Sequence, residues 1–306
     1  MTAVNFDSIN RSVIKLRAEV PEDAFTAGIL GSQRIGNGVV IDSAGLILTI
    51  GYLMTEATDV WLTGPDGQEV AAHPLAYDQV TGFGLVLPLQ QLDVPPLPLG
   101  SSQTLLAGCE VHVLSAKEFG SPQAARVVAR REFAGAWEYL LEEAIFTAPA
   151  HPHWSGAALV DESGALVGVG SLLVREVIEG EELNANMFVP IDLLKPVLHD
   201  LRSAGRADRP VRPWLGVYAV ELGGKVYVTG VVEGGPAQGA DLREGDIISE
   251  VANHPVGSLP DFYRRVWAVG PAGTTIPLTT VRSATQIRLN LRSVDRGDLL
   301  KRPQAN

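Results

Sequence analysis

The feature of this sequence that most constrains its fold is a turn pattern repeated between short apolar runs. The turn spans Asp42 to Gly45 in "GVVIDSAGLILTI", Pro65 to Gly67 in "VWLTGPDGQEV", and Asp161 to Gly164 in "ALVDESGALVGV". In each case an acidic residue or a proline begins the turn, and a glycine accepts the positive φ that closes it. The pattern therefore predicts three β-hairpins. The 32 glycines and 20 prolines separate many more apolar runs, which favours a mostly β protein.

Length and charge limit the classes of function. A chain of 306 residues with 46% hydrophobic residues has room for two domains or three small ones. The net charge is −11 and no block of Lys or Arg is present, which argues against binding to nucleic acids or anionic membranes. No apolar run approaches the roughly 18–20 residues that cross a bilayer.

The N-terminal segment "MTAVNFDSINRSVIKLRAEV" lacks the basic head and apolar stretch of a signal peptide. A cytoplasmic location is therefore expected if this is the full chain, and a periplasmic or secreted one if a leader has been removed. Cys109 is the single cysteine, so no intrachain disulfide can form, and we expect a small buried apolar residue there.

One helix and a domain boundary are indicated near the middle of the chain. "IDLLKPVLHDLRSAG" (191–205) has apolar residues at helical spacing and ends at a glycine, although Pro196 interrupts it. The polar, proline-containing stretch that follows is typical of an interdomain linker. We expect a first domain over residues 1–205, a linker over 206–212, a second domain over 213–294 and a frayed polar tail over 295–306.

The pieces of this chain, in their order, resemble the HtrA/DegP family of proteases. The resembling segments are "GNGVVIDSAGLILTIGYL", "LPLGSSQTLLAG" with "VHVLS", "NMFVPIDLLKPVLHDLRSAGR", "WLGV" and "GGPAQGADLREGDIISEVANHPV". The resemblance implies a trypsin-like double β-barrel followed by a PDZ domain, which is β-rich with one or two helices.

The catalytic motifs of that family are only partly present. The nucleophile motif Gly-Asn-Ser-Gly-Gly-Pro-Leu reads His-Trp-Ser-Gly-Ala-Ala-Leu here, which keeps Ser155 as the nucleophile position. The resemblance places Tyr52, after "LTIG", at the triad histidine position and Gly82, in "TGFG", at the triad aspartate position. His153 takes the place of the glycine that contributes to the oxyanion hole.

These replacements remove the chemistry that activates a serine. A serine hydroxyl is a weak nucleophile until an adjacent base takes its proton, and the aspartate orients that base. Tyrosine, with an ordinary pKa of about 10, carries little phenolate at neutral pH. Gly82 has no side chain to orient a base, and the Cβ of His153 disfavours the backbone conformation that a glycine allows in the oxyanion hole.

Other residues near the motif have less chemical significance. His151 and His153 lie close to Ser155 in sequence, but a side chain two residues before a serine usually points away from its hydroxyl. Asp78 lies in the loop of Gly82, where the family often has an acid outside the triad. Trp154 either fills the space of a substrate side chain or covers the end of the barrel. The remaining histidines are interpreted as surface or structural residues: His73, His112, His199 and His254.

No cofactor or metal is expected. "HPH", with His151 and His153, is the only close pair of histidines, and no third ligand can be placed beside it. The glycine patterns resemble hairpin turns rather than phosphate loops, because no helix start follows them.

In the second domain, the resemblance places a carboxylate-binding loop at Trp214, Leu215, Gly216 and Val217. The backbone N–H groups of such a loop accept the C-terminal carboxylate of a peptide, which adds a strand to the sheet. A helix in "SLPDFYRRVWAVG" is expected to line the groove. There Phe262, Val266 and Trp267 either shape a side-chain pocket or belong to the core.

Three functions remain open from the sequence. One is a pseudoprotease that binds peptides or protein C-termini through its PDZ domain and also through the degenerate cleft. Another is an active serine endopeptidase, acting in protein quality control, that uses Ser155 with an unconventional base. The third is an oligomer scaffold, since family members commonly trimerise through N-terminal aromatic residues, for which Phe6 or Phe25 is the candidate here.

Overall fold

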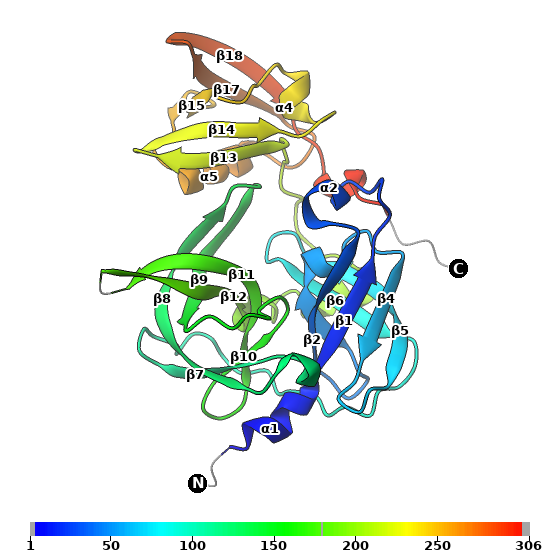
Figure 1. The fold of residues 1–306 in the computed structure, drawn as a ribbon. Coiled ribbons are helices and arrows are strands. Elements are labelled where there is room, and N and C mark those ends of the chain that lie inside the picture. Colours follow the sequence, from blue (N-terminus) through cyan, green and yellow to red (C-terminus); the bar gives the residue numbers. More distant parts are fainter. Residues whose placement is uncertain (1–3, 179, 302–306) are drawn as a thin grey trace. The chain divides into compact units, whose positions relative to one another are not determined.

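The computed structural model describes residues 4–178 and 180–301, which divide into two compact units (Figure 1). Unit 1 contains the described residues up to Arg131, then Glu143–Asp208 and the described end of the chain from Leu300. Unit 2 contains Glu132–Glu142 and Arg209–Leu299. The hairpin segment Glu132–Glu142 thus belongs to unit 2 although it lies far from the rest of that unit in sequence.

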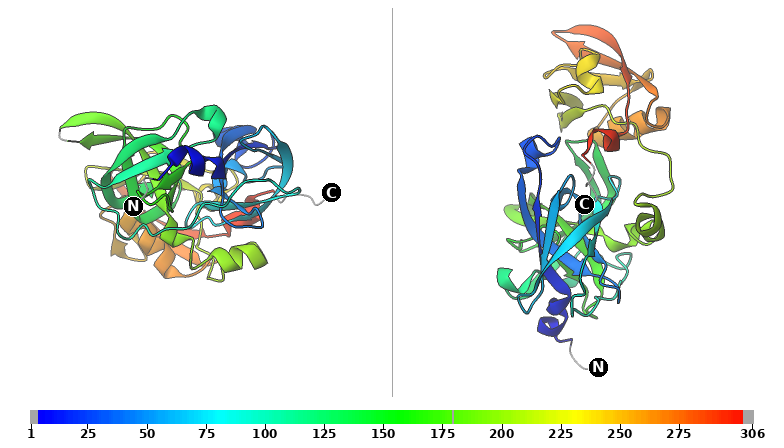
Figure 2. Two further views of the ribbon diagram at one scale, coloured as in Figure 1. Left: turned by 90° about the horizontal axis from the view of Figure 1, so that it is seen from below. Right: turned by 90° about the vertical axis from the view of Figure 1, so that its right-hand side faces the viewer.

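The first half of unit 1 is a closed six-stranded barrel with the strand order β1-β2-β3-β6-β5-β4. It appears in blue and cyan in Figures 1 and 2. Buried and exposed positions alternate along β5, as a strand with one face in a core requires. The strands are β1 (Val13–Glu19), β2 (Gln33–Val40), β3 (Ile47–Ile50), β4 (Asp59–Thr63), β5 (Glu69–Tyr77) and β6 (Phe83–Pro88).

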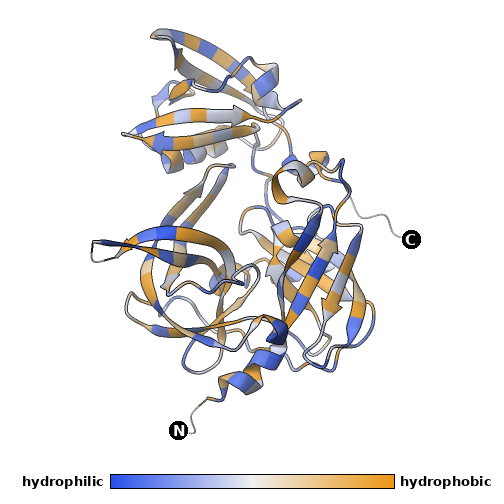
Figure 3. Cartoon of the chain, in the orientation of Figure 1, coloured by the Kyte–Doolittle hydropathy of each residue, from blue (hydrophilic) through white to orange (hydrophobic). Residues whose placement is uncertain are grey.

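The second half of unit 1 is another closed barrel, with the order β10-β11-β12-β9-β8-β7. Its strands are antiparallel and carry both hydrophobic and hydrophilic residues (Figure 3). The strands are β7 (Glu110–Leu114), β8 (Gln123–Gly135), β9 (Tyr139–Ala148), β10 (Ala158–Val160), β11 (Leu166–Ile178) and β12 (Glu181–Pro190). The mostly β, double-barrel prediction is confirmed.

All three predicted hairpins are present. They connect β2 to β3, β4 to β5, and β10 to β11. Gly45, Gly67 and Gly164 have φ values of 83°, 86° and 80°, so each closes its turn in the left-handed region. The carboxylate of Asp161 accepts hydrogen bonds from the N–H groups of Ser163 and Ala165, which explains why an acidic residue begins this turn.

The expected helix over 191–205 is interrupted. It consists of a 3₁₀ turn, η4 (Ile191–Leu193), and a separate helix, α3 (Leu198–Ala204). Pro196 lies between them and has no backbone N–H to continue a helical ladder, so α3 begins two residues after it. The predicted end is correct, because Gly205 takes a left-handed conformation at the C-cap. The other short helices of unit 1 are α1 (Phe6–Ile9), η1 (Asn10–Ser12), α2 (Ala27–Leu30), η2 (Gly51–Leu53) and η3 (Lys117–Phe119).

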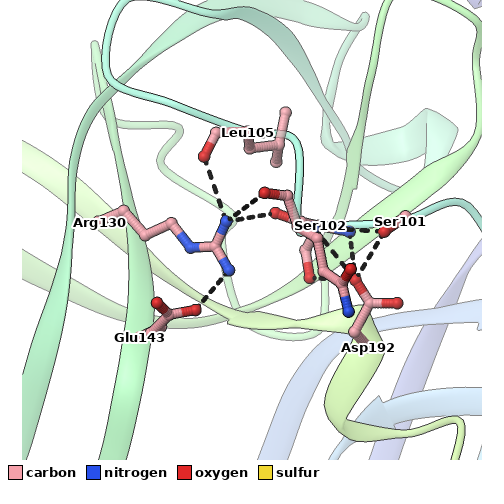
Figure 4. Close-up of polar contacts among 7 residues, drawn as sticks. Ser101, Ser102, Leu105, Arg130, Glu143 and Asp192 are labelled. Carbon is pink, nitrogen blue, oxygen red and sulfur yellow. Dashed lines mark hydrogen bonds and ion pairs between the residues drawn. The ribbon is translucent and has the colours of Figure 1, made fainter.

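A polar cluster holds the segment that joins the two barrels (Figure 4). Asp192 accepts hydrogen bonds from the hydroxyls of Ser101 and Ser102, at 2.9 and 2.8 Å. Arg130 of β8 donates to the carbonyl of Ser102 and forms an ion pair with Glu143 of β9. Burial alone would raise the pKa of Asp192, but Lys195 and the two serine hydroxyls lower it well below its usual range. The joining segment is therefore fixed to both β8 and η4.

Unit 2 is a six-stranded sheet with the order β13-β14-β15-β17-β18, in which β16 pairs with β15. The buried cluster of this unit includes Phe262 and Val266 of α5, and Ser258 caps that helix through a hydrogen bond with the N–H of Asp261. The elements are β13 (Val217–Leu222), β14 (Lys225–Val231), α4 (Pro236–Gly239), β15 (Ile247–Val251), β16 (His254–Pro255), α5 (Leu259–Val269), β17 (Thr275–Arg282), β18 (Thr285–Arg292) and η5 (Arg296–Leu299).

The described part of the tail, residues 295–301, is ordered rather than frayed. It contains η5, and the backbone N–H of Lys301 donates to the buried carboxylate of Glu56 at 2.9 Å. The Lys301 ammonium also forms an ion pair with Asp23. These contacts explain the order of a segment that is polar in composition. Residues 302–306 of the predicted tail lie outside the described residues.

Cys109 is half-buried beside the core of the second barrel, so the expectation of a buried residue there is only partly met.

Candidate active-site region around Ser155

Ser155 lies in the loop between β9 and β10, and Tyr52 lies in η2, directly after β3. The Oη atom of Tyr52 is 2.7 Å from the Oγ atom of Ser155 and 2.8 Å from the carbonyl oxygen of Ser171. The two barrels therefore bring Tyr52 and Ser155 into direct contact across 103 residues of sequence.

Gly82 is the third of the predicted triad positions. It lies in the loop between β5 and β6, where its carbonyl oxygen accepts a hydrogen bond of 2.7 Å from the N–H of Gly51, the residue before Tyr52. Its φ of 87° falls in the region that favours glycine. The residue beside the Tyr52 turn thus has no side chain with which to orient a base.

The hydrogen bonds around Tyr52 define where the protons lie. The carbonyl of Ser171 can only accept, so the single phenolic proton of Tyr52 is donated there. The hydroxyl of Ser155 then donates its own proton to Tyr52. Burial raises the pKa of Tyr52 to about 12, although its contacts with Ser155 and Trp154 act in the opposite direction. Tyr52 is therefore a neutral phenol and a very weak base toward Ser155.

The backbone N–H of His153, the predicted oxyanion-hole position, forms a hydrogen bond within its own loop. The N–H of His153 donates to the Nδ1 atom of His151 at 3.1 Å. His153 does not adopt a left-handed conformation, and its ring stacks on Phe119 with the centroids 4.6 Å apart. One of the two donors that an oxyanion hole would need is thus used inside the loop.

His151 is a structural residue. Its ring is buried, with Nε2 3.5 Å from the hydroxyl of Ser115, and its backbone N–H donates to Asn186 at 2.6 Å. Burial, and to a smaller extent the neighbouring His153, lowers the pKa of His151, so it is neutral near pH 7. Across residues 4–178 and 180–301, which include every histidine of the chain, no imidazole forms a hydrogen bond with Ser155.

The remaining candidates have structural surroundings. Asp78 accepts hydrogen bonds from the hydroxyl and N–H of Thr81, which shape the loop before Gly82. The carbonyl of Trp154 accepts from Ala157, within the turn that carries Ser155. His112 stacks on Phe6 at a centroid separation of 3.6 Å. The other three histidines, His73, His199 and His254, are exposed.

In unit 2, three members of the predicted carboxylate-binding loop do bind a carboxyl group. The N–H groups of Leu215, Gly216 and Val217 donate to the carboxyl of Glu138, with Gly216 at 2.7 Å and Val217 at 3.0 Å. Gly216 has a φ of 75°, which turns its N–H toward the same point as its neighbours. Trp214 does not join them, because its N–H donates to the carbonyl of Val294 at 3.0 Å.

The predicted groove helix is α5. Its residues Phe262 and Val266 are buried in the core of the unit. Trp267 is only partly buried: it stacks on Tyr263, and the guanidinium of Arg212 lies 3.8 Å from the centroid of its ring. Phe262 and Val266 therefore belong to the core, and Trp267 lies at its edge.

Comparisons with known proteins agree with both parts of this architecture. Residues 36–169 match the model of the trypsin-like peptidase domain, and residues 213–292 match the model of the PDZ domain. The chain is 25% identical over 278 residues to a probable periplasmic serine endoprotease, DegP-like, of Pseudomonas fluorescens. This chain is an HtrA-like protein.

Further relatives and solved structures match the chain over most of its length. The HtrA-like chain is 28% identical over 273 residues to the chloroplastic Protease Do-like 1 of Arabidopsis thaliana. Its fold matches the HtrA-type protease AlgW solved with a decapeptide, with a TM-score of 0.58, 20% identity and coverage of 98% of this chain and 100% of that one. The serine endoprotease from Yersinia pestis matches with a TM-score of 0.57, 22% identity and coverage of 96% and 99%.

The match to the curated relatives is partial in length. It covers 85% of the HtrA-like chain but 56% of the Pseudomonas protein, and 80% of the chain but 60% of the Arabidopsis protein. In the described part of the HtrA-like chain, no helix is long and apolar enough to span a membrane.

Sequence reasoning missed Asn37, which organises the Ser155 loop of the HtrA-like chain. Its side-chain amide donates to the carbonyls of His153 and Ser155 at 2.9 and 3.0 Å, and its Oδ1 accepts from the N–H of Ala116 at 2.8 Å. The side chain is fully buried. An asparagine within the otherwise apolar "GNGVV" run was the available signal, because a buried amide requires several partners.

A second missed group supports the Tyr52 turn. The buried guanidinium of Arg34 donates to the carbonyls of Tyr52 and Thr55, at 2.7 and 3.0 Å, and to the hydroxyl of Thr26. Glu56, also buried, accepts from the hydroxyl and N–H of Thr26. Burial would raise the pKa of Glu56, but these hydrogen bonds and those from Lys301 and Phe25 lower it overall. The backbone that presents Tyr52 to Ser155 is therefore fixed.

Proposed function

We propose that this HtrA-like protein is proteolytically inactive and binds peptides or protein C-termini through its PDZ domain. The observation that carries the first part is the contact of 2.7 Å between Tyr52 and Ser155. A neutral phenol with a raised pKa occupies the position from which a base would act on the serine. Loss of triad members typically removes about 10⁴-fold or more of the rate.

A reactive fluorophosphonate probe tests the inactivity. We expect no adduct on Ser155 by mass spectrometry and no casein cleavage by the purified protein. A Ser155→Ala variant provides the matched control, and Ser163→Ala, at an exposed turn, shows whether any labelling is non-specific. An adduct on Ser155 together with casein cleavage, both absent from Ser155→Ala, would contradict the proposal and support an active endopeptidase with an unconventional base.

The PDZ part of the proposal is supported by the three N–H groups of Leu215, Gly216 and Val217, which converge on a carboxyl group. A peptide with a free C-terminal carboxylate should bind more tightly than the same peptide with an amidated C-terminus. The amide presents one acceptor in place of a charged pair of oxygens. Equal affinities for the two peptides would remove this part of the proposal.

A periplasmic location and an oligomeric state are two further parts of the proposal. The name of the Pseudomonas relative places that protein in the periplasm, and no finding supports the cytoplasmic expectation. Fractionation of cells expressing the natural protein tests the location. A trimer is inferred from resemblance alone, and light scattering on the purified protein tests it, since a monomer at micromolar concentration would exclude it.

A further inference from the structure

The hairpin segment Glu132–Glu142 is built into unit 2 around a buried carboxyl group. Glu138 accepts hydrogen bonds from three consecutive backbone N–H groups, those of Leu215, Gly216 and Val217. Both of its oxygens are used, since Leu215 approaches Oε1 at 3.2 Å and Oε2 at 3.0 Å. This is the arrangement in which a nest of backbone donors binds a carboxylate.

The backbone of the same segment lies between β13 and α5. The N–H of Ala219, in β13, donates to the carbonyl of Ala136 at 3.0 Å. On the other side, the hydroxyl of Tyr263, in α5, donates to the carbonyl of Gly135 at 2.7 Å and accepts from the N–H of Glu138 at 3.2 Å. The segment therefore contacts both walls of the groove, as a bound peptide strand would.

Apolar and charged contacts extend this docking. Leu140 is 5% exposed and belongs to the same buried cluster as Leu215, Val217 and Phe262. Arg264 of α5 forms ion pairs with both Glu132 and Glu142, at the two ends of the segment. One apolar side chain and one carboxyl group thus come from the hairpin, which are the two features that a peptide C-terminus supplies.

We infer that residues 135–140 act as an internal ligand of the PDZ groove, which an incoming peptide C-terminus must displace. The carboxyl of Glu138 occupies the place of the terminal carboxylate, Ala136 that of the paired peptide strand and Leu140 that of an apolar terminal side chain. This inference rests on the proposed function of the groove as a peptide site. It adds that the site is closed in the resting protein by the chain itself.

Self-occupancy has a measurable consequence for affinity. When the binding-competent state is only a fraction of the population, the apparent dissociation constant rises in proportion to the inverse of that fraction. Weakening the hairpin contact should therefore tighten the binding of a peptide without any change in the groove itself. Displacement would also release residues 132–142, which continue into β8 and β9 of the second barrel.

Hydrogen exchange of the full chain without a peptide tests the closed state directly. We expect the segment containing the N–H groups of Leu215, Gly216 and Val217 to exchange slowly in the wild type. In Glu138→Ala it should exchange at least about 10-fold faster, because the acceptor of all three groups is lost. Glu182→Ala is the matched control, since Glu182 is an exposed carboxylate on another long hairpin, β11–β12.

Competition with a peptide tests the displacement. The probe is a fluorescent pentapeptide, Phe-Ala-Gly-Ala-Leu, with a free C-terminal carboxylate. Its apolar residues follow the hairpin from Phe133 to Ala136 and end in a leucine in place of Leu140. We expect Glu138→Ala to bind it at least about 10-fold more tightly than the wild type and the Glu182→Ala control do.

The results separate failure of this inference from failure of the proposed function. Unchanged exchange at residues 215–217 in Glu138→Ala, with equal peptide affinity in both proteins, overturns the internal ligand but leaves peptide binding intact. Faster exchange without peptide binding in any variant supports the internal ligand and contradicts the peptide-binding function. If Glu138→Ala loses its folded circular-dichroism signal, Glu138→Asp replaces it. Its shorter side chain should give intermediate exchange and affinity, and wild-type values for both would overturn the inference.

Discussion

The loop around Ser155 and the loop from Leu215 to Val217 are both sites whose polar groups are already used by the chain, but they are closed in different ways. Ser155 contacts Tyr52, whose backbone carbonyl is held by the buried Arg34 in a turn that belongs to the first barrel. The donors at residues 215–217 contact Glu138, which lies on a hairpin remote in sequence from them. In the first site the contacting group lies in a turn of the first barrel that Arg34 fixes, whereas in the second it lies at the tip of a hairpin.

This difference has a chemical meaning. In the proposed function Ser155 lacks a base, and a neutral phenol does not become one when a substrate binds. At the PDZ loop the donors themselves are intact and correctly arranged, and only their acceptor would have to change. In the proposed function, catalysis is therefore lost by substitution, whereas peptide binding is limited by competition with the hairpin. We therefore expect mutations that loosen the contacts to promote peptide binding at the PDZ loop and to weaken the structure of the Ser155 site.

The largest effect is expected from Asn37→Ala, which should destabilise the first site together with its barrel. The substitution removes hydrogen bonds to His153 and Ser155 and leaves the buried N–H of Ala116 without its acceptor. We expect a loss of about 3 kcal/mol in the free energy of unfolding, measured with urea. Asn184→Ala, at an exposed position on β12, should change it by less than about 0.5 kcal/mol. Similar losses in both variants would show that Asn37 does not organise the Ser155 loop.

The second prediction concerns pH and the closed groove. Burial raises the pKa of Glu138 from 4.5 to about 7, although the N–H groups of residues 215–217 and Arg296 act in the opposite direction. The other titratable groups near it are Tyr218 and Tyr263, whose pKa values are raised by burial, so that both are neutral throughout this range.

The direction in which pH changes the closing equilibrium follows from proton linkage. Closing the groove raises the pKa of the carboxyl, so closure takes up a proton and is strongest at low pH. Between pH 4.5 and about 7 the closing equilibrium should weaken by up to about 10-fold per pH unit, and above pH 8 it should no longer change. Exchange protection at residues 215–217, corrected for the intrinsic pH dependence, provides the measurement. Protection that increases with pH would contradict the burial of Glu138 in the closed state.

Some of these features could be predicted from the sequence because their causes are local. The turn residues of each hairpin, an acidic residue or a proline followed by a glycine, specify the hairpins. The order of motifs predicts Tyr52, Gly82 and Ser155 as the triad positions, and the contact between Tyr52 and Ser155 agrees with this prediction. Asn37 and Glu138 could not be identified in this way. Their partners lie 79 to 118 and 77 to 79 residues away, and no local pattern marks a buried amide or a carboxyl that binds a distant loop. The interrupted helix lies between these cases, since Pro196 indicated a break but not the start of α3 at Leu198.

A third prediction tests whether the first site lacks only a base. Tyr52→His places an imidazole in the turn whose side chain reaches Ser155, and labelling of Ser155 by the fluorophosphonate probe should rise by about 10-fold or more. Casein cleavage should remain weak, because Gly82 provides no carboxylate and the N–H of His153 donates to His151. Tyr52→Phe, which lacks any base, is the matched control. Equal labelling of the two variants would show that the geometry of the loop, rather than the missing base, prevents reaction.

The smallest effect is expected in the groove, from Tyr263→Phe. The hydroxyl of Tyr263 contacts the hairpin on both sides of Trp137, at Gly135 and Glu138, but takes no part in the contact between Glu138 and the carboxylate-binding loop. Its removal should weaken closure by about 1 kcal/mol, or roughly 5-fold, because a buried carbonyl loses its donor while the carboxyl remains bound. Exchange at residues 215–217 should accelerate by that factor. Tyr227→Phe, at a half-buried position on β14, should leave it unchanged. Because Tyr263→Phe leaves Ser155 and its contacts untouched, labelling of Ser155 by the fluorophosphonate probe should stay at the wild-type level. A change in labelling would mean that the two sites do not respond independently and that the hairpin couples them.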